Sequence, residues 1–123
     1  MLALSPRTRV YLALGATDMR KSFDTLAGLV RETLEQDPLS GHLFVFTNRS
    51  RNRLKVLVWD GSGLWVMAKR LEKGTFSWPS EPPQKGAAAV VLTTAELSML
   101  LSGIDLKATR ARRWYRRLEG AES

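Results

Sequence analysis

The 123-residue sequence contains no cysteine and a single histidine, His42. Disulfides, thiolate metal sites and clusters of imidazole ligands are therefore excluded. No apolar run approaches the roughly 20 residues that a membrane-spanning helix needs. The N-terminal residues lack the charged lead and the long apolar core of a secretory signal. The sequence therefore predicts a cytoplasmic protein with no membrane association.

Glycine-rich phosphate-binding motifs are missing as well. Gly61, Gly63 and Gly74 fall in expected hairpin turns, whereas the loops that cradle nucleotide phosphates lie between a strand and a helix. The sequence therefore predicts no cofactor and no metal ion.

Positive charge is in excess and is unevenly distributed along the chain. The net charge is +7, and the isoelectric point is near 10.4. Residues 41–79 hold seven basic and two acidic side chains, residues 107–123 hold six and two, and residues 1–40 are balanced. Segregated positive charge is expected of a surface that contacts phosphate, although it also serves solubility and the binding of acidic proteins.

The segment from His42 to Pro79 carries the strongest strand pattern. Apolar runs alternate there with turn residues, which predicts consecutive antiparallel strands over residues 42–47, 53–59, 64–71 and 75–78. The period of two sends Val56 and Leu57 to opposite faces of the sheet. Because both faces are apolar in part, each needs a cover, or one face is kept for a partner.

Two helices are predicted on either side of this segment. Apolar residues spaced by three and four predict a long amphipathic helix from Asp18 to Gln36, capped by Thr17 or Asp18. Thr93 followed by Glu96 has the spacing of a capping box and predicts a short helix from Thr94.

The fold class predicted from these elements is α+β. Residues 9–14 and 87–92 supply two further strands. We expect a single domain over residues 1–106, in which an antiparallel β-meander is packed by the long amphipathic helix and the short C-terminal helix. Residues 107–123 are expected to form a basic C-terminal extension.

Acidic residues deserve testing as catalytic groups, because DNA-cutting enzymes gather carboxylates around paired metal ions. The candidates are Asp18, Asp24, Asp60, Glu72, Glu96 and Asp105. A nuclease would depend on Asp18 or Asp60, but these two have structural explanations, as a helix cap and as a turn residue. His42 has no partner nucleophile in the sequence and is interpreted as structural. A catalytic site is therefore the least favoured hypothesis.

Basic residues recur at every second position from Arg49 to Lys55. If this stretch is extended, their side chains project from one side and form a row of phosphate-binding groups. The alternative is a solvated hairpin whose charges prevent aggregation at a sheet edge. The predicted nucleic-acid-binding residues of this region are Arg49, Arg51, Arg53, Lys55, Lys69, Arg70 and Lys73.

The C-terminal extension interleaves arginines with Trp114 and Tyr115. Such a segment can become ordered on RNA, DNA or an acidic protein, and the alternative is a segment that is disordered in isolation. The predicted nucleic-acid-binding residues here are Arg110, Arg112, Arg113, Arg116 and Arg117. Trp59, Trp65 and Trp78 are interpreted as core or protein-contact residues rather than as base-stacking platforms.

Three short motifs carry a resemblance to a known family. They are DMRK at residues 18–21, KVLVWDG at residues 55–61 and KRLE at residues 69–72. With the runs around them, they resemble the small accessory proteins, called TnpB, of the insertion-sequence 66 family of bacterial transposable elements. Thr25 departs from the family pattern, in which glycine is more frequent. The RNA-guided nuclease that shares the name TnpB is a different protein.

The resemblance implies a non-catalytic protein that is encoded beside a separate, larger transposase and is needed with it for efficient transposition. Its expected partners are element DNA, the transposase, or both. A protein-interaction module without DNA affinity is the alternative, and a metal-dependent nuclease is a less favoured one. The sequence leaves self-association open.

Overall fold

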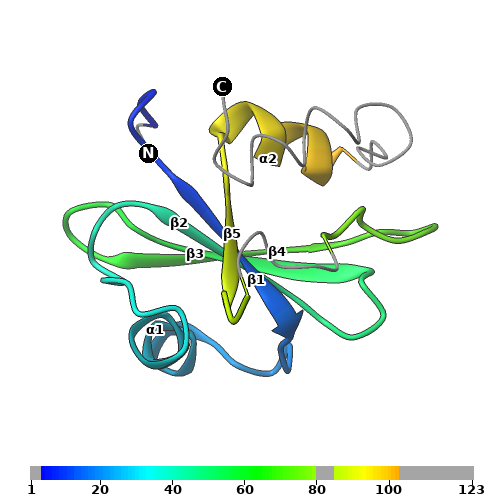
Figure 1. Cartoon of the computed structure of the whole chain (residues 1–123), viewed down its shortest axis with the longest axis horizontal. Helices are drawn as coiled ribbons and strands as arrows, with labels where there is room; N and C mark the ends of the chain where they lie inside the picture. The colour runs from blue at the N-terminus through cyan, green and yellow to red at the C-terminus, as the bar shows by residue number, and fades with distance from the viewer. Residues whose placement is uncertain (1–3, 80–84, 103–123) are drawn as a thin grey trace.

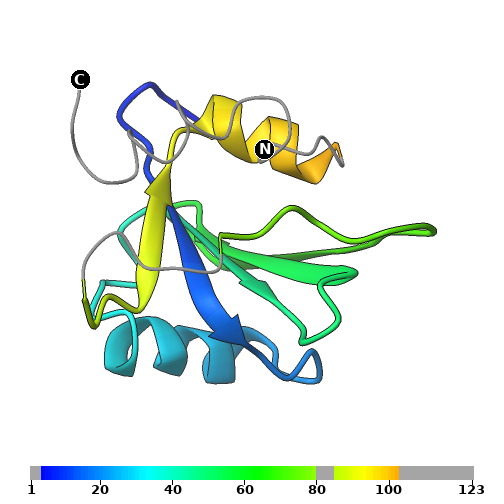
Figure 2. The same cartoon turned by 45° about the vertical axis from the view of Figure 1, so that its right-hand side comes forward.

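The computed structural model describes residues 4–79 and 85–102. These residues form a sheet with the strand order β4-β3-β2-β1-β5 and two helices. The helices lie on opposite faces of the sheet (Figures 1 and 2), so the α+β class is confirmed. The expected domain end at residue 106 and the 107–123 extension lie outside the described residues. In chain order the elements are β1 (Val10–Ala16), α1 (Phe23–Glu32), β2 (Leu43–Thr47), β3 (Arg53–Trp59), β4 (Leu64–Arg70), β5 (Ala89–Leu92) and α2 (Thr94–Leu101).

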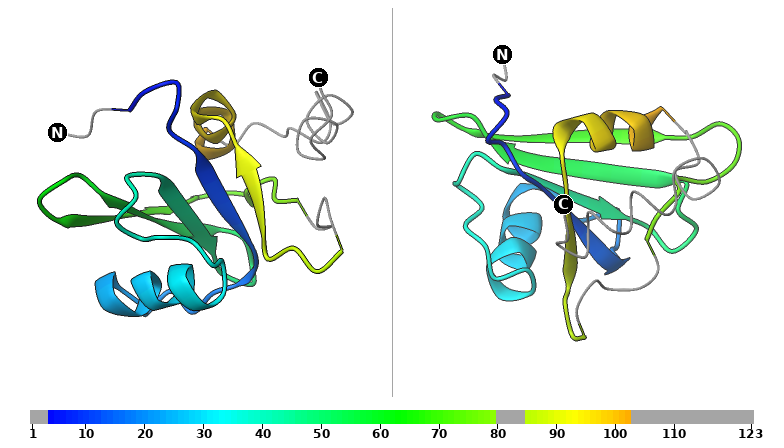
Figure 3. Two further views of the ribbon diagram at one scale, coloured as in Figure 1. Left: turned by 60° about the vertical axis from the view of Figure 1, so that its left-hand side comes forward. Right: turned by 45° about the horizontal axis from the view of Figure 1, so that its top comes forward.

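The sheet is mixed and is not a purely antiparallel meander. Strands β2, β3 and β4 pair antiparallel in succession, but β1 pairs parallel with β2 and antiparallel with β5. Figure 3 shows β5 beside β1 at one edge of the sheet. The parallel pair follows from the α1 crossover, because strands joined through a helix can run in the same direction.

The expected strand over Thr75–Trp78 is wrong. Its alternation of exposed and buried residues is real, since Phe76 and Trp78 are buried and Thr75 is exposed. However, the segment crosses the α2 face of the sheet instead of joining a ladder. The Phe76 N–H donates to the Arg51 carbonyl at 2.7 Å, and Trp78 Nε1 donates to the Ala13 carbonyl at 2.9 Å.

Helix α1 is shorter than expected and begins later. The predicted cap, Asp18, instead organises a turn in which its Oδ1 accepts the Arg20 N–H at 2.9 Å. The N-cap is Ser22, whose N–H donates to Thr25 Oγ1 at 2.9 Å. After the helix, Glu35 has a φ of 55°. This left-handed conformation ends the helix before Gln36.

Helix α2 begins as predicted at Thr94. The Glu96 N–H donates to Thr93 Oγ1 at 3.1 Å, and Glu96 Oε1 accepts the Thr93 N–H at 2.9 Å. These reciprocal bonds form a capping box that satisfies two backbone donors at the helix start.

Two apolar clusters, one on each face, hold the helices to the sheet. Val56 and Val58 belong to the α2-face cluster with Leu97 and Leu100, which α2 contributes. Leu57 faces the other way and packs with residues of α1. The predicted register of β3 is therefore confirmed. Neither helix of the described part of the chain has the length and apolarity required for a membrane span.

Candidate nucleic-acid interface

Two arginines meet directly across the β3–β4 ladder. Arg53, at the start of β3, lies opposite Arg70, at the end of β4. The neighbouring pair is hydrogen-bonded, since the Leu71 N–H donates to the Asn52 carbonyl at 2.8 Å. Arg53 and Arg70 therefore occupy a non-hydrogen-bonded position, where facing residues come closest. Like charges at such a position oppose folding.

Little negative charge compensates this pair. Among the described residues, the carboxylate in ion-pair contact with this pair is Glu72, whose Oε2 lies 3.7 Å from Arg70 Nη2, and both side chains are largely exposed. Exposed ion pairs at this distance contribute little to stability. Within the part of the chain that the structure describes, no strong ion pair occupies either guanidinium group, so both are placed to bind an external anion.

Lys55 extends the positive surface toward the loop before α1. Its Nζ donates to the Lys21 carbonyl at 2.8 Å. An ammonium group has three donors, so this bond fixes the side chain and leaves two donors for another acceptor. The bond also holds the residue 18–21 loop against β3.

These side chains line an open groove of about 460 Å³, which we call the basic groove. It is lined by Met19, Arg53, Leu54, Lys55, Ala68, Lys69, Arg70 and Glu72. Glu72 is the one acidic residue in this lining. The groove therefore has an excess of positive charge, which is what contacts with a phosphate backbone use.

The predicted row from Arg49 to Lys55 is interrupted. Residues 48–52 form a turn, and Arg51 has a φ of 59°, so the stretch is not extended and its side chains do not share one side. Only Arg53 and Lys55 lie on a strand and face the same way. Arg49 is exposed in the turn, and Arg51 is half-buried.

The other predicted binding residues are scattered. Lys69 is opposite Leu54 and so faces α2 rather than the Arg53 side. Its Nζ donates to the Leu101 carbonyl at 2.7 Å, which satisfies an acceptor at the end of α2. Lys73 is exposed in the turn after β4. The five C-terminal arginines lie outside the described residues.

Arg20 and Lys21 were not predicted as binding residues, because the expected helix placed them on its solvated side. In the structure they belong to the loop that Lys55 holds beside the basic groove. The only sequence signal for them was the DMRK motif itself, which marks the family without indicating a position in space.

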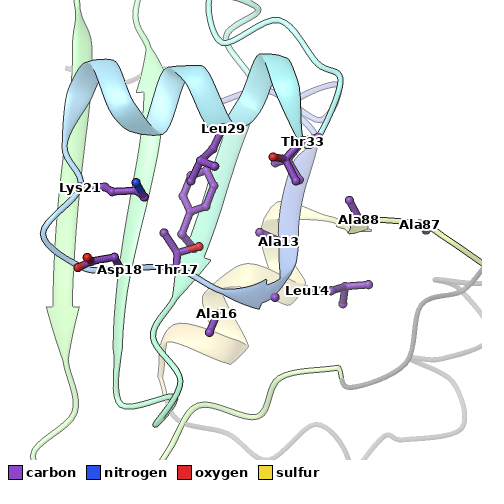
Figure 4. Close-up of a pocket in the computed structure, with 13 residues that line it drawn as sticks. Ala13, Leu14, Ala16, Thr17, Asp18, Lys21, Leu29, Thr33, Ala87 and Ala88 are labelled. Atoms are coloured by element: carbon purple, nitrogen blue, oxygen red, sulfur yellow. The ribbon is translucent and has the colours of Figure 1, made fainter.

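A second hollow, of about 320 Å³, lies on the other side of the same loop. Figure 4 shows its wall of small apolar side chains, with Leu29 reaching from α1 and Thr33 from the position directly after the helix. Asp18 and Lys21 also line it and bring the charged groups. The residue 18–21 loop thus contributes to both hollows.

The two carboxylates on which a nuclease would depend have structural roles in turns. Hydrogen bonds from the side chain and backbone of Arg20 lower the pKa of Asp18 to about 2. The pKa of Asp60 is lowered well below its ordinary value, first by the Ser62 N–H and then by Trp65 Nε1 and the Gly63 N–H. Within the described residues, no group of three histidine, aspartate or glutamate side chains could hold a metal ion.

Stability is expected to fall in acid partly through Asp60. A carboxylate whose pKa is lowered by folding stabilises the fold above its ordinary pKa of 3.8, and this contribution is lost as the pH falls further. Asp60→Asn should therefore have a lower melting temperature than the wild type at pH 6, and the difference between the two melting temperatures should narrow from pH 4 to pH 2. Thermal unfolding followed by circular dichroism measures this difference. A difference that stays constant over this range would contradict the assignment.

The other sequence candidates are structural or mixed. His42 Nδ1 accepts the Arg9 N–H at 3.0 Å, and its ring lies edge-on to Tyr11 at 5.8 Å, which confirms a structural histidine. Trp78 is buried, as interpreted. Trp65 is 44% exposed and donates from Nε1 to Asp60 Oδ2 at 2.7 Å, so it is not a core residue.

Comparison of the sequence with known protein families relates most of the chain to an insertion-sequence family. A family model described as "IS66 Orf2 like protein" matches residues 8–111. The chain therefore belongs to the IS66 Orf2-like (TnpB) family of insertion-sequence accessory proteins, and the resemblance is confirmed.

Two relatives of the chain come from Sinorhizobium fredii (strain NBRC 101917 / NGR234). The uncharacterized protein y4hO is 47% identical over 105 residues, which cover 85% of this chain and 88% of the relative. The uncharacterized protein y4jC is 35% identical over 105 residues, covering 85% and 86%. No solved structure matches the chain.

Proposed function

We propose that this protein is a non-catalytic accessory factor of transposition that binds the DNA backbone of its element through the basic groove. The observation that carries the proposal is the Arg53–Arg70 pair, which lies directly across the ladder and, among the described residues, has one weak carboxylate contact, from Glu72 to Arg70. A like-charged pair at a non-hydrogen-bonded position opposes folding. Its presence in an otherwise well-packed sheet is explained by an anion that binds between the two groups.

A phosphodiester backbone is the anion that suits the groove. Guanidinium groups bind phosphate oxygens in pairs, and an ammonium group adds a third donor from Lys55. Such contacts orient a protein on DNA without reading the bases. Membership of an insertion-sequence family makes element DNA the relevant polymer. The transposase is the alternative partner for the same surface.

Neutralising the pair should weaken DNA binding and reduce its salt dependence. For the double variant Arg53→Gln/Arg70→Gln, we expect the slope of log affinity against log salt to fall by about 2 units, because each phosphate contact contributes about 0.9. Fluorescence anisotropy with labelled element-end DNA at several salt concentrations measures the slope. The free energy of unfolding should stay level or rise by a few tenths of a kcal/mol, because a like-charge opposition is removed.

The matched control is Arg7→Gln/Arg31→Gln, which removes the same charge from two exposed arginines away from the groove. This control should keep the wild-type slope. Equal slopes in the groove variant and the control variant would contradict DNA binding by the groove. The transposase would then be tested as the partner by co-purification after nuclease treatment. If the wild type and the control variant retain the transposase and the groove variant does not, the surface binds the transposase.

A further inference from the structure

Strand β4 leaves one side of the sheet open. It is seven residues long and lies at the end of the strand order, paired only with β3. In residues 4–79 and 85–102, no other strand pairs with its outer side. A long open edge is a template for the addition of another strand.

Two backbone hydrogen bonds fix which backbone groups point outward. The Leu71 N–H donates to the Asn52 carbonyl at 2.8 Å, and the Asp60 N–H donates to the Gly63 carbonyl at 3.0 Å. Antiparallel pairs alternate between hydrogen-bonded and non-hydrogen-bonded positions. The odd-numbered residues of β4 therefore bond to β3, and the N–H and C=O groups of Leu64, Val66, Ala68 and Arg70 point away from the sheet.

Exposed apolar side chains stand beside this edge. Trp65 is 44% exposed and Met67 is 38% exposed, on the face of β4 that α2 occupies farther along the sheet. Lys69 follows them on the same face. An unpaired edge with two large apolar residues beside it is the type of surface at which chains associate.

We propose that two copies of this chain pair through β4, antiparallel and centred on Met67. In this register all seven residues of β4 find a partner, and the outward groups of Leu64 and Val66 meet those of Arg70 and Ala68 in the second copy. The two Met67 side chains face each other across a non-hydrogen-bonded position, where side chains are closest. The pairing joins two five-stranded sheets into one.

Charge selects this register over its neighbours. Lys69 lies opposite Trp65 of the second copy, where its aliphatic stem covers the ring while its ammonium keeps the bond to the Leu101 carbonyl of its own chain. A register centred on Lys69 would instead place two ammonium groups opposite each other, which is repulsive. In the Met67 register the two Arg70 residues are six positions apart, roughly 20 Å. The basic grooves of the two copies therefore do not repel at close range.

Ala68→Pro tests the pairing without breaking the β3–β4 ladder. The Ala68 N–H points outward, so proline removes a donor only from the open edge. In sedimentation equilibrium of the full chain, free of DNA, the apparent mass of the wild type should rise with protein concentration toward twice 13.8 kDa. Ala68→Pro should stay at 13.8 kDa with an unchanged circular dichroism spectrum.

The matched control is Val91→Pro on the opposite edge. The Leu14 N–H donates to the Ala88 carbonyl at 3.0 Å, so the groups of Val91 also point away from the sheet. Val91 is 45% exposed, close to the values at β4. Val91→Pro should self-associate like the wild type. A wild type that remains monomeric, or an Ala68→Pro variant that dimerises equally well, would overturn the proposal.

A disulfide tests the register even if the proline variant does not fold. The chain has no cysteine, so Met67→Cys introduces a single thiol. Facing residues at a non-hydrogen-bonded position have Cα atoms about 4.5 Å apart, within the range for a disulfide. On mild oxidation Met67→Cys should form a covalent dimer at least about tenfold faster than Val91→Cys. Equal rates for the two variants would reject a dimer centred on Met67.

Discussion

Replacing Trp78 with alanine is expected to lower the free energy of unfolding by about 3–5 kcal/mol. The side chain is 4% exposed and lies in the α2-face cluster. Its Nε1 also donates to the Ala13 carbonyl at 2.9 Å, which ties the 75–79 segment to β1. The substitution removes apolar packing and this bond together. Urea unfolding followed by circular dichroism measures the loss.

Two further variants separate the contributions. Trp78→Phe keeps an aromatic ring but leaves the buried Ala13 carbonyl without this donor, so a smaller loss of about 1–3 kcal/mol is expected. Phe23→Ala is the control, because Phe23 is 46% exposed and should cost less than about 1 kcal/mol. If Trp78→Ala cost no more than Phe23→Ala, the segment would not be anchored to the sheet by this residue.

Trp78 also shows where strand prediction from sequence fails. The alternation of apolar and polar residues predicts that every second residue is buried, and Phe76 and Trp78 are buried. It does not report what buries them. A segment that crosses the face of a sheet, with its bulky side chains pointing toward the sheet, has the same alternating pattern as a strand within the sheet. Only the hydrogen bonds distinguish the two.

Local rules succeeded where the partner is near in sequence. The four-residue turn at 60–63 fixes the register of β3 with β4. The pairing of Arg53 with Arg70 could therefore be predicted from the sequence. The parallel β1–β2 pair and the β1–β5 pair depend on contacts between distant segments. No turn specifies them, and the mixed sheet was therefore missed.

The candidate site was half predictable for the same reason. Arg53, Lys55 and Arg70 come from one hairpin and were all predicted. The residue 18–21 loop joins them only because the β1–β2 pairing and the Lys55 bond bring it to β3. The predicted row of four basic residues failed because residues 48–52 form a turn, in which the left-handed conformation of Arg51 breaks a period of two.

Asn48 is the side chain that holds this turn in place. Its Oδ1 accepts the Asn52 N–H at 3.1 Å and the Arg53 N–H at 3.2 Å, and its Nδ2 donates to Asn52 Oδ1 at 2.8 Å. Asparagine is suited to this role because its amide can imitate a turn of the backbone. The same turn presents the Arg51 carbonyl to the Phe76 N–H. Asn48 therefore connects the start of β3 with the segment that crosses the sheet.

Asn48→Ala is expected to lower the free energy of unfolding by about 2 kcal/mol, because half-buried donors lose their acceptor. It should also weaken DNA binding without removing a charge, since Arg53 begins the strand that the turn positions. Urea unfolding and the anisotropy assay measure the two effects. Ser50→Ala, an exposed change in the same turn, should alter neither. Unchanged DNA affinity in a measurably destabilised Asn48→Ala variant would show that the position of Arg53 does not depend on the turn.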